Sequence, residues 1–298
     1  MSHPLPRWRW AALVSCLVLV AIPVSLSAQR VTRRVFVSAV DASGAPVLDL
    51  AAADFRVTES DVKREVTRAS LGNAPMRIVL LVDSSTSMAP MVSSIRAGLN
   101  AFLDTLPIEH EITFITTGGQ IRVRTPPTTD RGQLRKEVGL LAAAGGANAF
   151  LDTLLESDRR FLKTAPGQWP AFVIVTTDKG EMNREPNLDD YNRFMNDFLG
   201  RGGSAHAVIL VGRQVGLVTD LVLNLVQNMG GTQASINTDF SLPERMKGIA
   251  ERLAADHRQM ASKYEVEFSG DAKLQQPIVN VEVSREGVQV LMSPRRPF

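Results

Sequence analysis

A continuous apolar run at residues 78–82, Ile-Val-Leu-Leu-Val, is the feature that most constrains the fold. A strand that is apolar at every position is typical of a sheet buried on both faces, as parallel sheets are. Further strand patterns lie at residues 111–116, 121–124, 171–177 and 205–211. A short loop with Gly118 and Gly119 separates the first two of these, which predicts a hairpin.

Helical patterns lie between the strands, at residues 91–106, 130–141, 148–161, 189–199 and 218–228. Strands that alternate with helices predict an α/β domain with a doubly wound, mostly parallel sheet covered on both sides. A long closing helix is expected at residues 242–263, with Ser241 as its N-cap and Pro243 in its first turn. We place this domain at residues 75–262.

Two β-rich segments flank the domain, at residues 31–73 and 263–298. The first contains strand patterns at residues 35–41, 55–59 and 65–70, and the second at 264–268, 278–283 and 288–292. We expect the two segments to pack together as one small accessory module.

The first 28 residues have the order of a secretory signal peptide. Arg7 and Arg9 precede an apolar run at residues 11–22, and small residues lead to an expected cleavage site near Ala28. A retained membrane anchor is the alternative, but a bilayer needs ~20 apolar residues, and Pro23 interrupts this run early. The only cysteine, Cys16, lies in the leader, so the exported chain is expected to have no disulfide. We therefore expect a periplasmic or extracellular protein, with membrane contact only if the leader is retained.

The charge balance gives no electrostatic case for binding nucleic acid. The chain has 33 basic and 31 acidic residues, and loss of Arg7 and Arg9 leaves 31 of each. A near-neutral chain without a basic face in sequence is not typical of a nucleic-acid-binding protein.

Oxygen-bearing side chains follow the first buried strand directly, in the run Asp83-Ser84-Ser85-Thr86-Ser87. Alternate side chains of an extended segment point to one side, so the oxygens of Asp83, Ser85 and Ser87 can face one point. That point lies at the carboxyl end of a strand, where α/β sheets bind ligands. Such oxygens suit a hard divalent cation, with magnesium expected first and manganese or calcium as alternatives. The competing explanation is that the hydroxyls cap the following helix.

The run DSSTSM resembles the D-x-S-x-S metal-ion-dependent adhesion site of von Willebrand factor type A domains. The segments IRVRTPPTTDRGQL and VIVTTDKGE resemble the edge hairpin and the "TDG" strand end of that family. The flanking segment VDASGAPVLDLAAADFRVTE is similar to secreted von Willebrand factor A-related proteins of the acidobacterial type.

The resemblance implies two further ligands. Asp178 matches the aspartate at the end of the fourth sheet strand, although Lys179 stands before Gly180. The family's threonine is missing: alignment on the following helix places Asn148 at its position, and alignment on Gly145-Gly146 places Ala147 there. We prefer Asn148, whose amide oxygen can ligate a hard ion.

The sequence thus favours an exported, non-enzymatic binding or adhesion protein that recognises a carboxylate of a protein partner through the cation. The alternative is a metal-free structural or assembly scaffold with a degenerate site. A hydrolase is a remote alternative. It would need a serine nucleophile with a histidine base, but no G-x-S-x-G motif is present. The histidines after the leader, His110, His206 and His257, are expected to be solvated or to lie in the core. Phosphoryl transfer at Asp83 lacks a nearby second carboxylate, since the next acidic residue is Asp104.

Overall fold

The computed structural model describes residues 30–178, 182, 187–211, 216–275 and 277–292. The proposed leader, Lys179 and Gly180 therefore lie outside the described residues. Within the described residues, no helix is long and apolar enough to span a bilayer.

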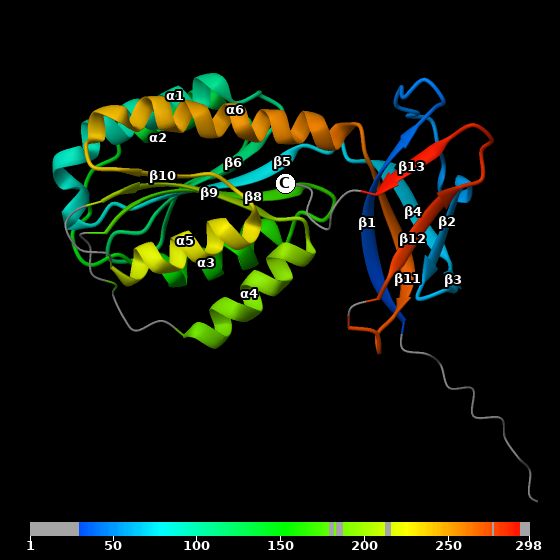
Figure 1. The fold of residues 1–298 in the computed structure, drawn as a ribbon. Coiled ribbons are helices and arrows are strands. Elements are labelled where there is room, and N and C mark those ends of the chain that lie inside the picture. The colour runs from blue at the N-terminus through cyan, green and yellow to red at the C-terminus, as the bar shows by residue number, and fades with distance from the viewer. Residues whose placement is uncertain (1–29, 179–181, 183–186, 212–215, 276, 293–298) are drawn as a thin grey trace, which may run out of the picture.

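The larger body is a three-layer α/β domain around a six-stranded sheet (Figure 1). The strand order is β10-β9-β8-β5-β6-β7, and all neighbours are parallel except β6 and β7, which form the expected antiparallel hairpin. The strands are β5 (Met76–Val82), β6 (Glu111–Thr116), β7 (Arg122–Thr128), β8 (Trp169–Thr177), β9 (Ser204–Leu210) and β10 (Gln233–Ile236). The doubly wound, mostly parallel fold class is confirmed.

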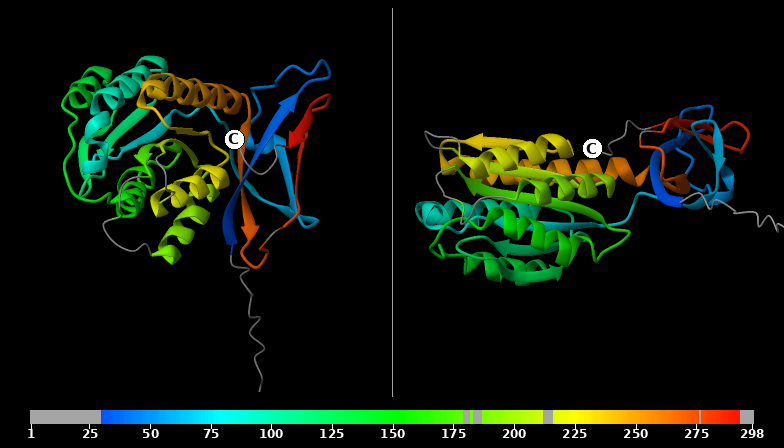
Figure 2. Two further views of the ribbon diagram at one scale, coloured as in Figure 1. Left: turned by 60° about the vertical axis from the view of Figure 1, so that its left-hand side comes forward. Right: turned by 90° about the horizontal axis from the view of Figure 1, so that it is seen from below.

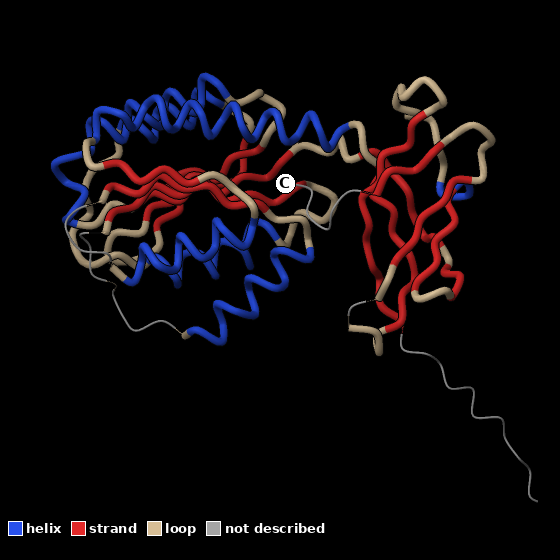
Figure 3. Tube along the Cα trace, viewed as in Figure 1, coloured by secondary structure: helices blue, strands red, loops and turns tan. Residues whose placement is uncertain are grey.

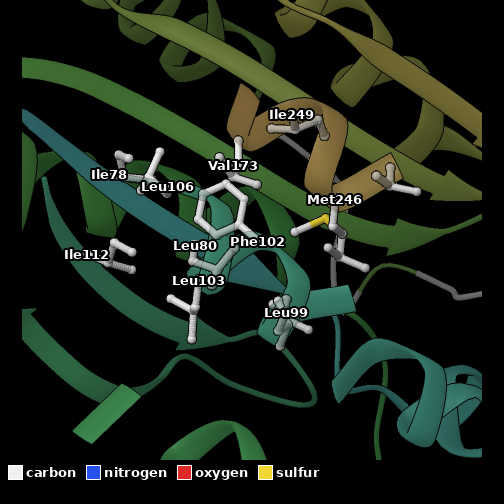
Figure 4. Close-up of a cluster of buried hydrophobic side chains, with 14 of the residues drawn as sticks. Ile78, Leu80, Leu99, Phe102, Leu103, Leu106, Ile112, Val173, Met246 and Ile249 are labelled. Atoms are coloured by element: carbon white, nitrogen blue, oxygen red, sulfur yellow. The ribbon is translucent and has the colours of Figure 1, made fainter. Parts of the chain in front are cut away.

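Helices cover both faces of this sheet, as the layers in Figure 3 show. One face carries α1 (Val92–Thr105), α2 (Arg131–Gly139) and α6 (Leu242–Ala261); the other carries α3 (Phe150–Ser157), α4 (Leu188–Gly200) and α5 (Leu217–Met229). Figure 4 shows the first core, where Phe102 of α1 and Met246 of α6 lie over Leu80 of β5. Both faces of β5 and β8 are covered by apolar side chains, which explains their uninterrupted apolar sequences.

The described segments 30–71 and 264–292 form a second, all-antiparallel body. Its four-stranded sheet has the order β13-β1-β11-β4, and its three-stranded sheet has the order β12-β2-β3. The strands are β1 (Arg30–Val40), β2 (Phe55–Glu59), β3 (Val62–Arg64), β4 (Val66–Leu71), β11 (Tyr264–Asp271), β12 (Val279–Val283) and β13 (Gln289–Met292). Side chains of both sheets, such as Val37, Phe55 and Val266, share one core.

The accessory module lies at the amino ends of the sheet strands, and Figure 2 shows the same placement from two further sides. β4 leads into β5 there, and α6 runs back across the sheet to enter β11. The carboxyl edge of the sheet, where the D-x-S-x-S run lies, is therefore at the far end of the domain from the module.

Candidate metal centre

Asp83 begins the loop that leaves β5 at the carboxyl edge, and both neighbouring strands hold this end in place. Its backbone N–H donates to the carbonyl of Val175 in β8 at 2.8 Å. On the other side, the N–H of Thr117 donates to the carbonyl of Val82 at 3.1 Å. The carboxylate thus projects from between two fixed strands.

The Asp83 carboxylate is buried, with 2% of the residue exposed, and it is well supplied with donors. Oδ1 accepts from the backbone N–H of Ser85 at 2.8 Å. Oδ2 accepts from Nδ2 of Asn148 at 2.8 Å and from the hydroxyl of Thr176 at 3.3 Å. Burial raises the pKa of Asp83, while the hydrogen bonds from Ser85 and Thr176 act in the opposite direction.

The Ser85 hydroxyl does not cap a helix. Ser85 stands at the N-cap position of the short 3₁₀ helix η2 (Thr86–Met91), but its side chain makes no capping hydrogen bond. Helix α1 begins later, with Met91 at its N-cap. Ser85 Oγ is buried and has no partner with good hydrogen-bond geometry, and its weak hydrogen bond to the Asp83 carboxylate lowers the pKa of that group. Capping therefore does not explain this serine, and Ser87 follows, half-buried, within η2.

Asn148 is fully buried, and its side chain reaches Asp83 from the loop before α3. Its orientation differs from our expectation. Nδ2 faces the Asp83 carboxylate, while Oδ1 accepts from the hydroxyl of Thr117 at 2.6 Å. The structure thus brings Asn148 into the site, but with its donor rather than its acceptor toward the expected cation position.

Asp178 is the first residue after β8 and is 8% exposed. The residue before it, Thr177, has its backbone N–H at the Asp83 carboxylate and lowers the pKa of that group. Asp178 itself donates its N–H to the carbonyl of Leu210 at 3.2 Å. Asp178 therefore continues directly from a strand end that contacts Asp83, and its role as a ligand remains a prediction.

Sequence reasoning missed two members of this cluster, Thr117 and Thr176. Both are buried and both hydrogen-bond to the Asp83–Asn148 pair. Their positions in the sequence could have predicted this role. Each lies at the carboxyl end of a parallel strand that neighbours β5, where polar side chains meet in α/β sheets.

The donor set fits a small, hard divalent cation. It consists of a carboxylate and hydroxyl oxygens, which are the ligands that magnesium prefers. The buried Ser85 hydroxyl without an aligned partner is an acceptor that a cation would satisfy. Asn148 is the exception, because an N–H group cannot ligate a cation.

The histidines do not support a catalytic serine. Nδ1 of His110 accepts from the N–H of Met76 at 3.2 Å, and Nδ1 of His206 accepts from that of Thr232 at 3.1 Å. Nε2 of His257 lies 2.8 Å from the carbonyl of Ala74. All three are thus engaged by backbone groups, and Met76 and Ala74 lie at the amino end of β5, away from Ser85.

Within the described part of the chain, Glu109, His110 and His257 also have possible ligand atoms within 4.8 Å of one another. His110 is not available as a ligand there. Because its Nδ1 accepts a backbone N–H, the proton of the neutral ring is on Nε2, and neither nitrogen has a free lone pair. We therefore assign no metal to this cluster.

Residues 78–181 match the family model of the von Willebrand factor type A domain. Among solved structures, the chain resembles a von Willebrand factor type A protein from Catenulispora acidiphila, with a TM-score of 0.51 and 15% identity over 88% of this chain and 70% of that one. It also resembles proximal thread matrix protein 1 from the mussel byssus, with a TM-score of 0.50 and 12% identity over 62% of this chain and 49% of that one.

A further structure of the mussel protein has zinc in its metal-ion-dependent adhesion site (MIDAS) motif. It matches with a TM-score of 0.50 and 12% identity over 61% of this chain and 48% of that one. This chain thus spans about half the length of the mussel protein. Likeness at these identities establishes the fold alone. The curated proteins yield no match to this sequence.

Proposed function

This chain carries a von Willebrand factor type A domain, and we propose that it is an exported, non-catalytic binding protein that captures a carboxylate of a protein partner through a divalent cation. Asp83, Ser85 and Ser87 would hold the cation, with Asp178 contributing directly or through water. The proposal places recognition at the carboxyl edge of the sheet, on the opposite side from the accessory module.

The observation that carries the proposal is the buried Ser85 hydroxyl beside the Asp83 carboxylate. The Ser85 O–H faces the Asp83 carboxylate, and no donor fills the lone pairs of its oxygen, so these are free to ligate a cation. A magnesium ion bound there would keep surplus positive charge, because one or two carboxylates and neutral hydroxyls do not fill or neutralise its shell. That charge is what would attract an acidic side chain of the partner.

The test is thermal unfolding with and without a cation. Millimolar magnesium or manganese should raise the Tm of the native protein, because a ligand that binds the folded state alone stabilises it. The Asp83→Ala variant should lose this shift. Asp104→Ala, which removes an exposed carboxylate that pairs with Arg135, is the matched control and should keep it. An unchanged Tm for the native protein at saturating cation would reject the proposal.

A metal-free scaffold is the second candidate, and one observation favours it. The amide of Asn148 already donates to the Asp83 carboxylate at 2.8 Å, so the carboxylate has a partner without any cation. A partner protein retained equally with and without chelator, together with no thermal response to cations, would favour this candidate.

Export is proposed from the leader-like residues 1–28. Expression in a bacterial host with an intact secretion system should give a mature chain beginning near Gln29, measured by intact mass. A mature chain that retains Arg7 and Arg9 in the membrane fraction would support the anchor instead.

A further inference from the structure

The orientation of the Asn148 side chain has a consequence for any cation at this site. Nδ2 lies 2.8 Å from Oδ2 of Asp83 and 3.2 Å from the hydroxyl of Thr176. Oδ1 lies 2.6 Å from the hydroxyl of Thr117. Every polar atom of this fully buried amide is therefore engaged.

We infer that Asn148 sets the cation affinity of the site, by holding the Asp83 carboxylate in the cation-free state and turning its amide over when a cation binds. This inference rests on the proposed cation site and adds the residue that controls it. Asn148 thereby acts as an internal competitor of the ion for Asp83.

The observed and the reversed orientation of the Asn148 amide differ in their hydrogen bonds. In the observed one, an N–H faces a carboxylate and a hydroxyl donates to the amide oxygen, so donors meet acceptors at both ends. In the reversed one, the amide oxygen would face the carboxylate oxygen, and two acceptors at hydrogen-bond distance repel each other. A cation between them removes the repulsion, while the Thr117 hydroxyl can rotate to accept from Nδ2. The reversed orientation is thus stable only with a cation.

A threonine at position 148 would not have to turn its side chain over to accept a cation. A hydroxyl presents its donor and its lone pairs on one oxygen, so it can ligate a cation without a turnover of the side chain. Asn148→Thr should therefore lower the Kd for magnesium by about tenfold or more, which corresponds to the loss of one competing charge-assisted hydrogen bond. The same substitution should lower the Tm without cation, because the buried amide that joins the Asp83 carboxylate to the Thr117 hydroxyl is lost.

The experiment measures both quantities on the native chain, Asn148→Thr, Asn148→Ala and the control Asn228→Thr. The control asparagine is half-buried in α5, where its side chain donates to the carbonyl of Asn224 and has no contact with Asp83. Magnesium or manganese alone is the probe, with Kd from calorimetry and Tm from thermal unfolding. Opposite changes in Asn148→Thr, a lower cation-free Tm and tighter binding, support the inference. A role in packing alone would lower the Tm and leave the affinity unchanged or weaker. Asn228→Thr should change neither.

A second readout follows the Asn148 side chain in the native protein and uses the variant only to assign its resonances. In the protein labelled with ¹⁵N-asparagine, the Asn148 side-chain NH₂ resonances, assigned by their loss in Asn148→Thr, should exchange slowly with water when no cation is present. Saturating magnesium should shift them, because the NH₂ group leaves a carboxylate for a hydroxyl.

Three outcomes separate the two proposals. Equal Kd values for the native protein and Asn148→Thr, with unshifted NH₂ resonances, would overturn the role of Asn148 while leaving the cation site intact. If the native protein, Asn148→Thr and Asn148→Ala all fail to bind magnesium or manganese, the cation site is overturned and the inference with it. Tighter binding in Asn148→Thr that disappears when Asp83→Ala is added supports both.

Discussion

Two buried histidines are expected to control how stability varies with pH. His110 and His206 are 0% and 1% exposed, and burial, as the largest cause, lowers the pKa of each from 6.5 to about 4. Charge from His257 and Arg131 lowers the pKa of His110 further against a smaller opposing effect of Glu109, and Arg252 lowers that of His206. Both rings are neutral in the folded protein at pH 7.

The sign of the effect follows from proton uptake. Between pH 6.5 and about 4 the unfolded chain protonates these rings and the folded chain does not, so acid favours unfolding across this window. The loss of stability is absent above pH 6.5, grows as the pH falls, and reaches its full size below about pH 4. Each ring can account for roughly 3 kcal/mol, on the basis of about 1.4 kcal/mol per pKa unit.

His206→Asn is the variant that tests this prediction. An asparagine oxygen can accept the Thr232 N–H in place of Nδ1, and the amide does not titrate. The free energy of unfolding, measured by denaturant titration at several pH values from 4 to 7, should depend less steeply on pH in the variant than in the parent. Comparison with the parent matters, because buried acids such as Asp158, whose pKa is raised by burial, act with the opposite sign. Parallel pH curves for the two proteins would contradict the prediction.

At the scale of elements, the turn between β6 and β7 supports the loop of Asp83, Ser84 and Ser85 through a glycine. The N–H of Gly118 donates to the hydroxyl of Ser84 at 3.1 Å. A Cβ at Gly118 would lie 2.5 Å from the Ser84 carbonyl oxygen and 2.6 Å from its hydroxyl, which is closer than side chains tolerate. Only glycine lets the two loops approach this closely.

Gly118→Ala should therefore displace Ser84 and, with it, Asp83 and Ser85. We expect a loss of about 1–3 kcal/mol in the free energy of unfolding from overpacking, and a reduced thermal response to magnesium. Gly139→Ala is the matched control, because nothing lies within 4 Å of its Cβ position at the end of α2. The control should be neutral or up to roughly 1 kcal/mol more stable, since alanine is the better helix former. An unaltered cation response in a destabilised Gly118→Ala protein would show that the loop absorbs the displacement elsewhere.

The elements show which features local sequence could predict. Buried strands such as β5 and β8 were predicted because their apolar runs are continuous. β10 was missed because an edge strand of four half-polar residues has no such run. Pro126 and Pro127 lie within β7, which tolerates them as the other edge strand.

In the candidate site, too, local sequence features could be predicted and tertiary contacts could not. The D-x-S-x-S spacing and the position of Asn148 are local features, and the structure brings Asn148 to Asp83 as expected. The amide orientation could not be predicted, because it depends on Thr117, which is 31 positions away in sequence and joins Asn148 only in the folded sheet. The fit of Gly118 against Ser84 is likewise a tertiary contact.

For the whole molecule, the question is whether the two bodies unfold together. The module is built from both chain ends, with β11 paired between β1 and β4. Its interior also holds Glu59, fully buried and 2.8 Å from both Arg33 and Arg64. A module assembled in this way should lose its structure as a unit, because removal of any one partner leaves a buried charge or an unpaired strand.

Trp169 at the start of β8 connects this module to the α/β domain. Its ring centroid lies 5.2 Å from that of Phe36 in β1, and its indole N–H donates to the carbonyl of Gly72 at 3.0 Å. Gly72 in turn donates its N–H to the carbonyl of Lys263 at 2.8 Å, where α6 passes into β11. Both chain crossings between the bodies are thus fixed at one buried tryptophan, which is 5% exposed.

We therefore predict one cooperative unfolding transition for both bodies. In a chain of residues 30–298, Trp169 is the sole tryptophan, so its fluorescence reports the junction while far-UV ellipticity reports mainly the helices of the α/β domain. The two signals should share one midpoint in urea, since coincident probes are the mark of two-state unfolding. Phe36→Ala should shift the fluorescence midpoint below that of ellipticity, because the module loses its ring contact with the domain. Phe240→Ala, at a side chain that is 87% exposed, should move neither. Separate midpoints in the parent chain would mean that the module unfolds independently, and that a partner could act on it without disturbing the sheet edge that carries Asp83.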